Sequence, residues 1–177
     1  MSRDELIITL FGIFSFIALI ILFFVNVITL KKEDVDLLFK NAAKYIKDRG
    51  ELFERTYNYV ETKLPDEVKF VNELMEQQKI IESLDINKPS PQTFKILKKS
   101  YKMDNKFMKL IEIHPILKND NIYDFIKVEF ETNKQRIEYA IETYDKEAEK
   151  FNEFKQKKVF KQFAKLLRVK DYEYYQK

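Results

Sequence analysis

The feature that most constrains the fold is an uncharged apolar run near the start of the chain. Residues 6–30 read LIITLFGIFSFIALIILFFVNVITL, which is 25 residues without an acidic or basic side chain. At about 1.5 Å per residue a helix of this length measures about 37 Å, enough to cross a hydrocarbon core of about 30 Å. A cleaved signal peptide has a shorter apolar region that ends in a small-x-small cleavage site. This run is longer and lacks such a site. The sequence therefore predicts that residues 1–30 form an N-terminal tail and a retained transmembrane anchor.

The basic residues that flank the run predict its orientation. Arg3 precedes it, whereas six cations follow within twenty residues: Lys31, Lys32, Lys40, Lys44, Lys47 and Arg49. Because basic residues accumulate on the cytoplasmic side of a span, we expect a single-pass protein of the cell membrane with its N-terminus outside and its body in the cytoplasm. The lack of cysteine agrees with a reducing compartment.

Turn-forming residues are scarce, which excludes most folds that contain sheets. The chain has two glycines and four prolines among 177 residues, too few for the connections of a sandwich, a barrel or a doubly wound sheet. No proline interrupts residues 6–64, so we expect one nearly continuous helix there. Pro65 is expected at the first position of a second helix.

Two further helices are expected after the second. Ser90 followed by Pro91 is a helix start, and His114-Pro115 ends that helix. The polar cluster at residues 118–121 starts the last long helix. Residues 31–154 are thus predicted to form an antiparallel four-helix bundle, an all-α body that continues the anchor.

Apolar residues recur at intervals of three and four in each predicted helix, as in the seams of a coiled coil. The predicted seams are Val35, Phe39, Ala42, Ile46, Phe53, Thr56 and Val60; Val71, Leu74, Gln78 and Ile81; Phe94, Leu97, Tyr101, Met108 and Ile111; and Ile126, Phe130, Asn133, Ile137, Ala140, Tyr144, Ala148 and Phe151. Most of these positions are expected to be packed core.

Polar residues interrupt these seams and predict a structural polar layer. They are Arg49, Thr56, Asp104 and Asn133. A charge on a seam is tolerated when it is paired or reaches solvent, so Arg49 and Asp104 are expected to pair. Such a layer more often fixes helix register than lines a functional cleft, and the sequence leaves both open.

The C-terminal segment, residues 155–177, is basic and amphipathic. Residues 155–170 read KQKKVFKQFAKLLRVK, with seven cations and no acid. In a helix its apolar side chains share one side, and Lys158, Lys161, Lys165 and Arg168 lie largely on the other. The predicted helix lengths bring Lys155 back to the membrane surface. An interfacial helix on anionic lipid is one interpretation, with the tyrosines at 172–175 among the headgroups; packing of the apolar side on the bundle is the other.

Four segments resemble motifs of a known family. Residues 46–53 (IKDRGELF) resemble the LKRRxDLI run that follows the membrane helix of LemA-family proteins, and residues 114–118 (HPILK) resemble the family's YPDLKA motif. Residues 130–137 (FETNKQRI) and 144–152 (YDKEAEKFN) are similar to its L..TENRI run and its YN…YN pair. The resemblance implies a bacterial membrane-anchored helical bundle whose biochemical role is unsettled.

Candidate catalytic residues are lacking, so we expect a protein that is not an enzyme and has no cofactor. The single His114 has no second histidine or cysteine to complete a metal site. With 32 basic and 29 acidic side chains interspersed, nucleic acid is not an expected partner. An envelope adaptor or scaffold for other membrane proteins is the first functional hypothesis. A module that binds the bilayer surface is the second, and a small-ligand receptor is a weaker third; a homo-oligomer stays open.

Overall fold

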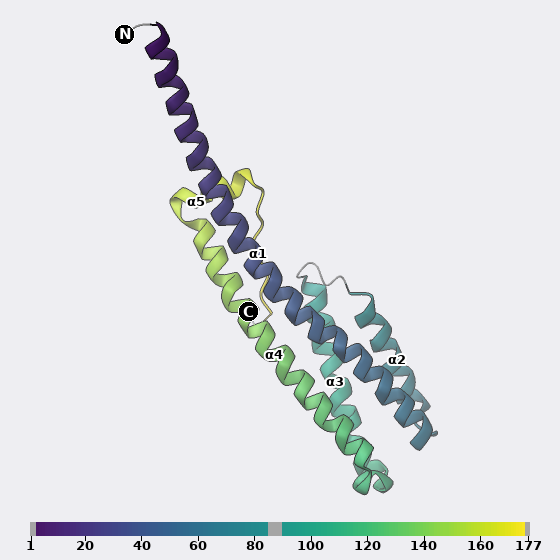
Figure 1. Ribbon diagram of the computed structural model, residues 1–177. Helices are drawn as coiled ribbons and strands as arrows, with labels where there is room; N and C mark the ends of the chain where they lie inside the picture. The colour runs from purple at the N-terminus through teal and green to yellow at the C-terminus, as the bar shows by residue number, and fades with distance from the viewer. Residues whose placement is uncertain (1–2, 85–89, 176–177) are drawn as a thin grey trace. The chain divides into compact units, whose positions relative to one another are not determined.

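All regular secondary structure in the described part of the chain is helical. A computed structural model describes residues 3–84 and 90–175, and these contain helices and no strand. The elements are α1 (Arg3–Lys63), α2 (Val68–Glu82), α3 (Pro91–Ile113), the 3₁₀ helix η1 (Pro115–Asn119), α4 (Asn121–Gln156) and α5 (Lys158–Leu166) (Figure 1). The predicted all-α class is confirmed.

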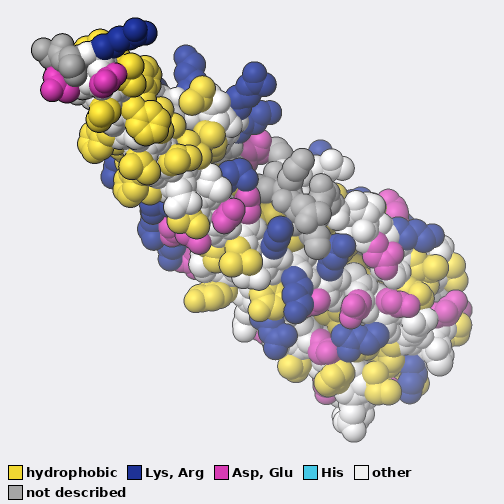
Figure 2. Space-filling view, turned by 45° about the horizontal axis from the view of Figure 1, so that its top comes forward, with side chains coloured by type: hydrophobic (Ala, Val, Ile, Leu, Met, Phe, Trp, Pro, Cys, Tyr) yellow, Lys and Arg dark blue, Asp and Glu magenta, His cyan; other side chains and the backbone are white. Residues whose placement is uncertain are grey.

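Helix α1 is a single helix of 61 residues. It passes residues 30–35 without interruption, as predicted, because no proline or pair of glycines lies there to break the hydrogen-bond ladder. The side chains from Arg3 to Phe23 are all exposed, and those after Phe23 become covered at intervals. Figure 2 shows the hydrophobic side chains gathered over the N-terminal part of α1.

The chain comprises two compact units. The first contains Met1–Val35 and Glu147–Tyr172, and the second contains Asp36–Lys146 and Glu173–Lys177. Helices α1 and α4 contribute residues to both units and run without interruption through the domain boundaries predicted after residues 30 and 154.

The second unit has one hydrophobic core to which its four long helical segments contribute. Phe130 of α4 lies at its centre, with ring centroids 5.8 Å from Phe53 of α1 and 5.5 Å from Phe107 of α3. The predicted seams of α1 and α4 are buried, except that Asn133 and Ala140 are half-buried; Val35, Ala148 and Phe151 of these seams belong to the first unit. Burial of these apolar faces is the main stabilising term of the unit.

The predicted seams of α2 and α3 need correction. Gln77 is buried in α2, and Gln78 is half-buried. In α3 the predicted Phe94 and Leu97 are buried, whereas the predicted Tyr101, Met108 and Ile111 are half-buried. The other buried residues of α3 are Thr93, Ser100, Met103, Asp104, Phe107 and Leu110. The buried face of α3 is rotated relative to the predicted seam because Ser100 and Asp104 point inward and bind Arg49. Apolar periodicity alone does not reveal these two polar positions.

The predicted start of α3 is confirmed, whereas the predicted start of α2 is wrong. Ser90 Oγ accepts a hydrogen bond from the Thr93 N–H at 3.1 Å, and Pro91 is the first residue of α3, as predicted. Pro65 is not the first residue of α2. It lies in a turn in which the Glu67 N–H donates to the Leu64 carbonyl at 2.9 Å, and α2 begins three residues later at Val68.

The start of α4 depends on Asp120. Its Oδ1 accepts hydrogen bonds from the N–H groups of Ile122 at 2.9 Å and Tyr123 at 3.1 Å, and its Oδ2 lies 3.1 Å from Lys63 Nζ. The Tyr123 N–H hydrogen bond, assisted by Lys63, lowers the pKa of Asp120 below its ordinary value. A carboxylate favoured in this way stabilises the folded state most strongly when it is ionised.

We expect Asp120→Ala to lower the free energy of unfolding by about 1 kcal/mol, because two N–H groups lose their cap. Asp120→Asn should cost less, since asparagine also caps helices. The difference in the free energy of unfolding between wild type and the Asn variant should be largest above pH about 4. It should disappear as the pH falls through the lowered pKa of Asp120. Urea unfolding in mild detergent at pH 7 and pH 3 measures both effects. Equal stabilities of wild type and the Ala variant at pH 7 would contradict the assignment.

Candidate functional site: a buried arginine layer and a basic helix

Arg49 of α1 is the largest fully buried side chain of the second unit, with 0% of its surface exposed. Its Nε donates to Ser100 Oγ at 3.0 Å, and its Nη1 donates to Asn133 Oδ1 at 3.1 Å. Its Nη2 donates to Asp104 Oδ1 and makes a longer contact of 3.5 Å with the Ser100 carbonyl. Burial of an arginine is tolerated only when its donors are satisfied in this way.

The acceptors of Arg49 come from two other helices, so the layer connects three of them. Ser100 and Asp104 belong to α3, and Asn133 belongs to α4. Asn133 also donates from Nδ2 to the Tyr45 carbonyl of α1 at 3.1 Å, which closes the connection between α4 and α1. A slip of any of the three helices by one residue would remove at least one of these bonds.

Aromatic rings surround the guanidinium group. Its carbon lies 4.8 Å from the Tyr101 ring centroid, 5.3 Å from Phe53 and 5.6 Å from Phe130. These rings exclude water, and a cation over an aromatic face is attracted to the ring quadrupole. Burial also raises the pKa of Asp104 above its ordinary value, although the hydrogen bond from Arg49 pulls it in the opposite direction.

The structure brings together three of the four predicted layer residues. Arg49, Asp104 and Asn133 form one network, whereas the Thr56 hydroxyl donates at 2.7 Å to the Leu52 carbonyl of its own helix. Ser100 is the member that sequence reasoning missed. Its only signal is its position four residues before Asp104, on the same face of α3.

The layer is a closed set of contacts. Four of the five N–H donors of Arg49 are directed at protein acceptors in the described structure, and none of its side-chain surface is exposed to a ligand. A shallow hollow of about 280 Å³ lies between α1 and α4 and shares Asn133 with the layer, but Arg49 does not line it. This geometry favours a role in helix register over a ligand-binding cleft.

We expect Arg49→Leu to destabilise the protein by about 3–5 kcal/mol, because Asp104 is left as a buried acid without its partner. Changing both Arg49 and Asp104 to Leu should recover most of this loss. The matched control is the cycle of Thr56→Val with Asp104→Leu, in which the two effects should add because Thr56 lies outside the network. Urea unfolding in mild detergent gives the four free energies of each cycle. Additive effects of the Arg49 and Asp104 substitutions would rule out the pair.

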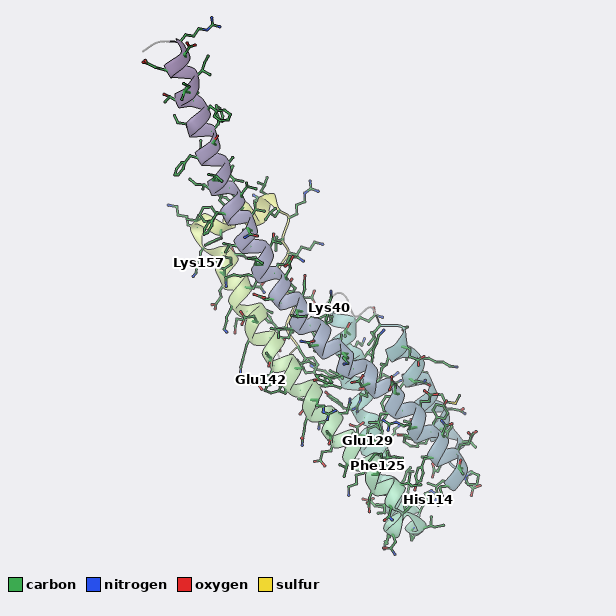
Figure 3. The ribbon with its side chains drawn as sticks, viewed as in Figure 1. Lys40, His114, Phe125, Glu129, Glu142 and Lys157 are labelled. Carbon is green, nitrogen blue, oxygen red and sulfur yellow. The ribbon has the colours of Figure 1, made fainter. Side chains whose placement is uncertain are left out.

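His114 makes a side-chain contact with Glu67 and ends α3. Its Nε2 lies 2.7 Å from Glu67 Oε1, and its backbone N–H caps the end of α3 at the Leu110 carbonyl (Figure 3). The described residues contain no group of three or more histidine, aspartate and glutamate side chains that could hold a metal ion.

Basic helix α5 belongs to the first unit and packs beside the apolar part of α1. The Phe163 ring stacks on Phe24 with centroids 4.9 Å apart, and Phe160 meets Phe24 edge-on at 5.2 Å. Phe154 at the end of α4 lies 4.1 Å from Phe160 and 5.2 Å from Lys31 Nζ. The return of the chain from Lys155 onward to the end of the apolar run agrees with the predicted helix lengths.

The predicted surface cations of α5 and of the turn after it are exposed. These residues are Lys158, Lys161, Lys165 and Arg168. The apolar side is divided: Phe160, Phe163 and Ala164 are covered, whereas 53% of Val159 and 71% of Leu166 are exposed. The apolar side of α5 therefore packs in part on Phe24 and Phe154 and is exposed in part. Neither of the two predicted alternatives, an interfacial helix or packing on the bundle, describes the whole of this side.

Two of the tyrosines expected among the headgroups make protein contacts instead. The Tyr172 hydroxyl donates to the Lys32 carbonyl at 3.3 Å in the first unit, and its N–H donates to Asn152 Oδ1 at 3.0 Å. Tyr175 belongs to the second unit, where its ring lies 5.3 Å from that of Phe94. Aromatic content alone does not distinguish packing from interfacial anchoring.

No protein-family model, no curated protein and no solved structure matches the chain. The resemblance to the LemA family therefore stays a prediction.

Proposed function

We propose that this chain is a single-pass membrane protein whose helical body acts as an adaptor for other membrane proteins. The main support for the proposal is that the two parts of α1 lie in different environments. Its residues 3–23 are exposed on every side, whereas its seam from Ile28 onward is buried. Residues 6–23 are predominantly apolar and exposed throughout. Such a segment is not stable in water and requires an apolar environment.

The exposed segment has the properties of a membrane span. Helix α1 is long and apolar enough to cross a membrane, and it lies near the N-terminus. Residues 6–23 rise about 27 Å, close to the thickness of a hydrocarbon core. The cations Lys31 and Lys32 support a cytoplasmic body and an outer N-terminus.

A cysteine placed at Asp4 should react with an impermeant maleimide in intact cells, because the N-terminus is outside. If the maleimide labels this cysteine only after the cells are permeabilised, the orientation is reversed.

We further propose that residues 36–146 form an antiparallel four-helix bundle. The support is the shared core of α1, α2, α3 and α4, together with the short connections at residues 64–67 and 114–120. A LemA-like body is proposed on the same basis. Arg49, Tyr123, Asn133 and Tyr144, which lie in or next to the motifs that carry the resemblance, make buried or half-buried polar contacts.

An adaptor needs a surface for its partner, and α4 offers apolar side chains that nothing covers. Phe125 is 58% exposed, Val128 is 60% exposed and Tyr139 is 73% exposed (Figure 3 for Phe125). Ile122, Phe125 and Val128 lie on one side of the first turns of α4, and Tyr139 lies toward the same side about three turns further along the helix. A cluster of large exposed apolar residues is typical of a protein-interaction surface. The closed Arg49 layer argues against the small-ligand receptor.

A photo-crosslinking amino acid at Phe125 should give a discrete adduct in living cells, because a partner covers this face of α4. The matched control is the same amino acid at Lys40, an exposed charged position on α1 in the same unit (Figure 3). An adduct of twice the chain mass would identify a homo-oligomer, and a larger defined mass would identify another protein. The absence of any adduct at Phe125, or identical adducts at both positions, would contradict the proposed surface.

A further inference from the structure

A lysine-lined hollow lies between the end of α4 and helix α5 in the first unit. Its volume is about 470 Å³, and the charged residues that line it are Lys155, Lys161, Lys165, Lys170 and Asp171. We call this group the lysine hollow. Four cations face one acid, so the hollow carries an excess of positive charge that an anion can neutralise.

Lys155 makes the hollow more than a group of surface lysines. Only 3% of its side chain is exposed, and its Nζ lies 2.6 Å from Asp171 Oδ1 and 3.3 Å from the Val169 carbonyl. The Phe151 ring centroid lies 5.9 Å from the same nitrogen. The contacts with Asp171 and Val169 use two of its three N–H donors, and the Asp171 side chain is 67% exposed, so one solvated carboxylate compensates this buried cation.

The backbone after α5 is held in the conformation that builds this hollow. Arg168 has φ of 53°, in the left-handed region, and the Val169 N–H donates to the Ala164 carbonyl at 3.0 Å. This pattern ends a helix and reverses the chain. The reversal brings Val169 and Asp171 over Lys155. A non-glycine residue in this conformation is uncommon and marks a local structure that its surroundings enforce.

The hollow lies next to the end of the exposed apolar segment. Phe163 of α5 stacks on Phe24, the first residue of α1 after the fully exposed stretch. If residues 6–23 occupy the hydrocarbon core, α5 lies at the level of the lipid headgroups. The exposed Val159 and Leu166, seven residues apart and therefore on one edge of α5, are suited to the adjoining acyl chains.

We propose that the lysine hollow binds the phosphate of an anionic phospholipid in the cytoplasmic leaflet. The proposal rests on the membrane span put forward above and adds a lipid ligand to it. Lys161, Lys165 and Lys170 surround the headgroup phosphate, and Lys155 supplies the buried charge at the base of the hollow. The acyl chains lie along Val159 and Leu166 beside α1. This basic surface follows the rule by which cations near the bilayer attract anionic lipid.

The full chain has no tryptophan, which permits a clean fluorescence test. The Leu166→Trp variant carries a single tryptophan beside the hollow and is reconstituted in vesicles of phosphatidylcholine and phosphatidylserine. Energy transfer is measured to a trace of headgroup-labelled phosphatidylserine or, separately, phosphatidylcholine. We expect the labelled anionic lipid to be enriched around this tryptophan on the order of tenfold over the zwitterionic one. The enrichment should disappear when Lys161, Lys165 and Lys170 are changed to Glu.

Matched controls separate this proposal from the membrane span. Changing the exposed Lys99, Lys102 and Lys127 of the second unit to Glu alters net charge equally and should leave the enrichment intact. In a separate variant, Phe14→Trp, the tryptophan lies in the apolar segment and should transfer energy to both lipids alike. Transfer in this variant without lipid preference in the Leu166→Trp variant overturns the headgroup site and leaves the anchor standing. Absence of transfer in the Phe14→Trp variant overturns the anchor itself.

A competition arm identifies the source of the phosphate. Inorganic phosphate and glycerophosphoserine are added at millimolar concentration to the reconstituted Leu166→Trp variant, whose lysines are all intact. The lipid site predicts that neither reduces the enrichment by more than a small fraction, because the acyl chains keep the phospholipid at the bilayer surface. Complete competition by inorganic phosphate would overturn the lipid and assign the hollow to a soluble phosphate.

Discussion

The structure depends on one constraint: a single helix, α1, has to satisfy two kinds of surroundings. Its residues 6–23 are predominantly apolar and exposed on every side, so no face of this segment is set aside for a protein core. Its later residues alternate between buried and exposed in the manner of a bundle helix. The change occurs at Phe24, where the α5 rings begin to cover α1. The proposed span and the proposed position of α5 at the lipid headgroups both depend on this change of surroundings.

Within the second unit, Arg49 specifies how the helices match one another. Apolar seams tolerate a shift of one helical turn, because one leucine or phenylalanine packs much like another. A guanidinium group with acceptors on α3 and α4 does not tolerate it, since each displaced acceptor would leave a buried donor unpaired. The layer therefore selects a single register of the helices. The free-energy cost of desolvating Arg49 is offset by three side-chain acceptors and three aromatic rings.

Much of this fold could be predicted from sequence because its signals are local. The apolar run, the Ser90 cap and the scarcity of glycine and proline each depend on neighbouring residues alone. The pairing of Arg49 with Asp104 was predictable because a charge on a seam needs a partner. Ser100 was not, since a serine on a helix carries no comparable demand. The lysine hollow was also beyond prediction, because it requires a left-handed Arg168, and no glycine or asparagine at that position indicates it.

The change of surroundings along α1 is most directly measured by nitroxide scanning. The chain has no cysteine, so single cysteines at successive positions from 8 to 36 can each carry a spin label in reconstituted vesicles. Collision rates with oxygen and with a water-soluble nickel complex then report the medium at each position. A membrane span predicts high oxygen and low nickel accessibility at every position from 8 to 23, highest near Phe14 for oxygen. Beyond Phe24 the accessibility should vary with a period of about 3.6 residues. Nickel accessibility on one face throughout residues 8–23 would show a helix packed on protein in water and would contradict the span.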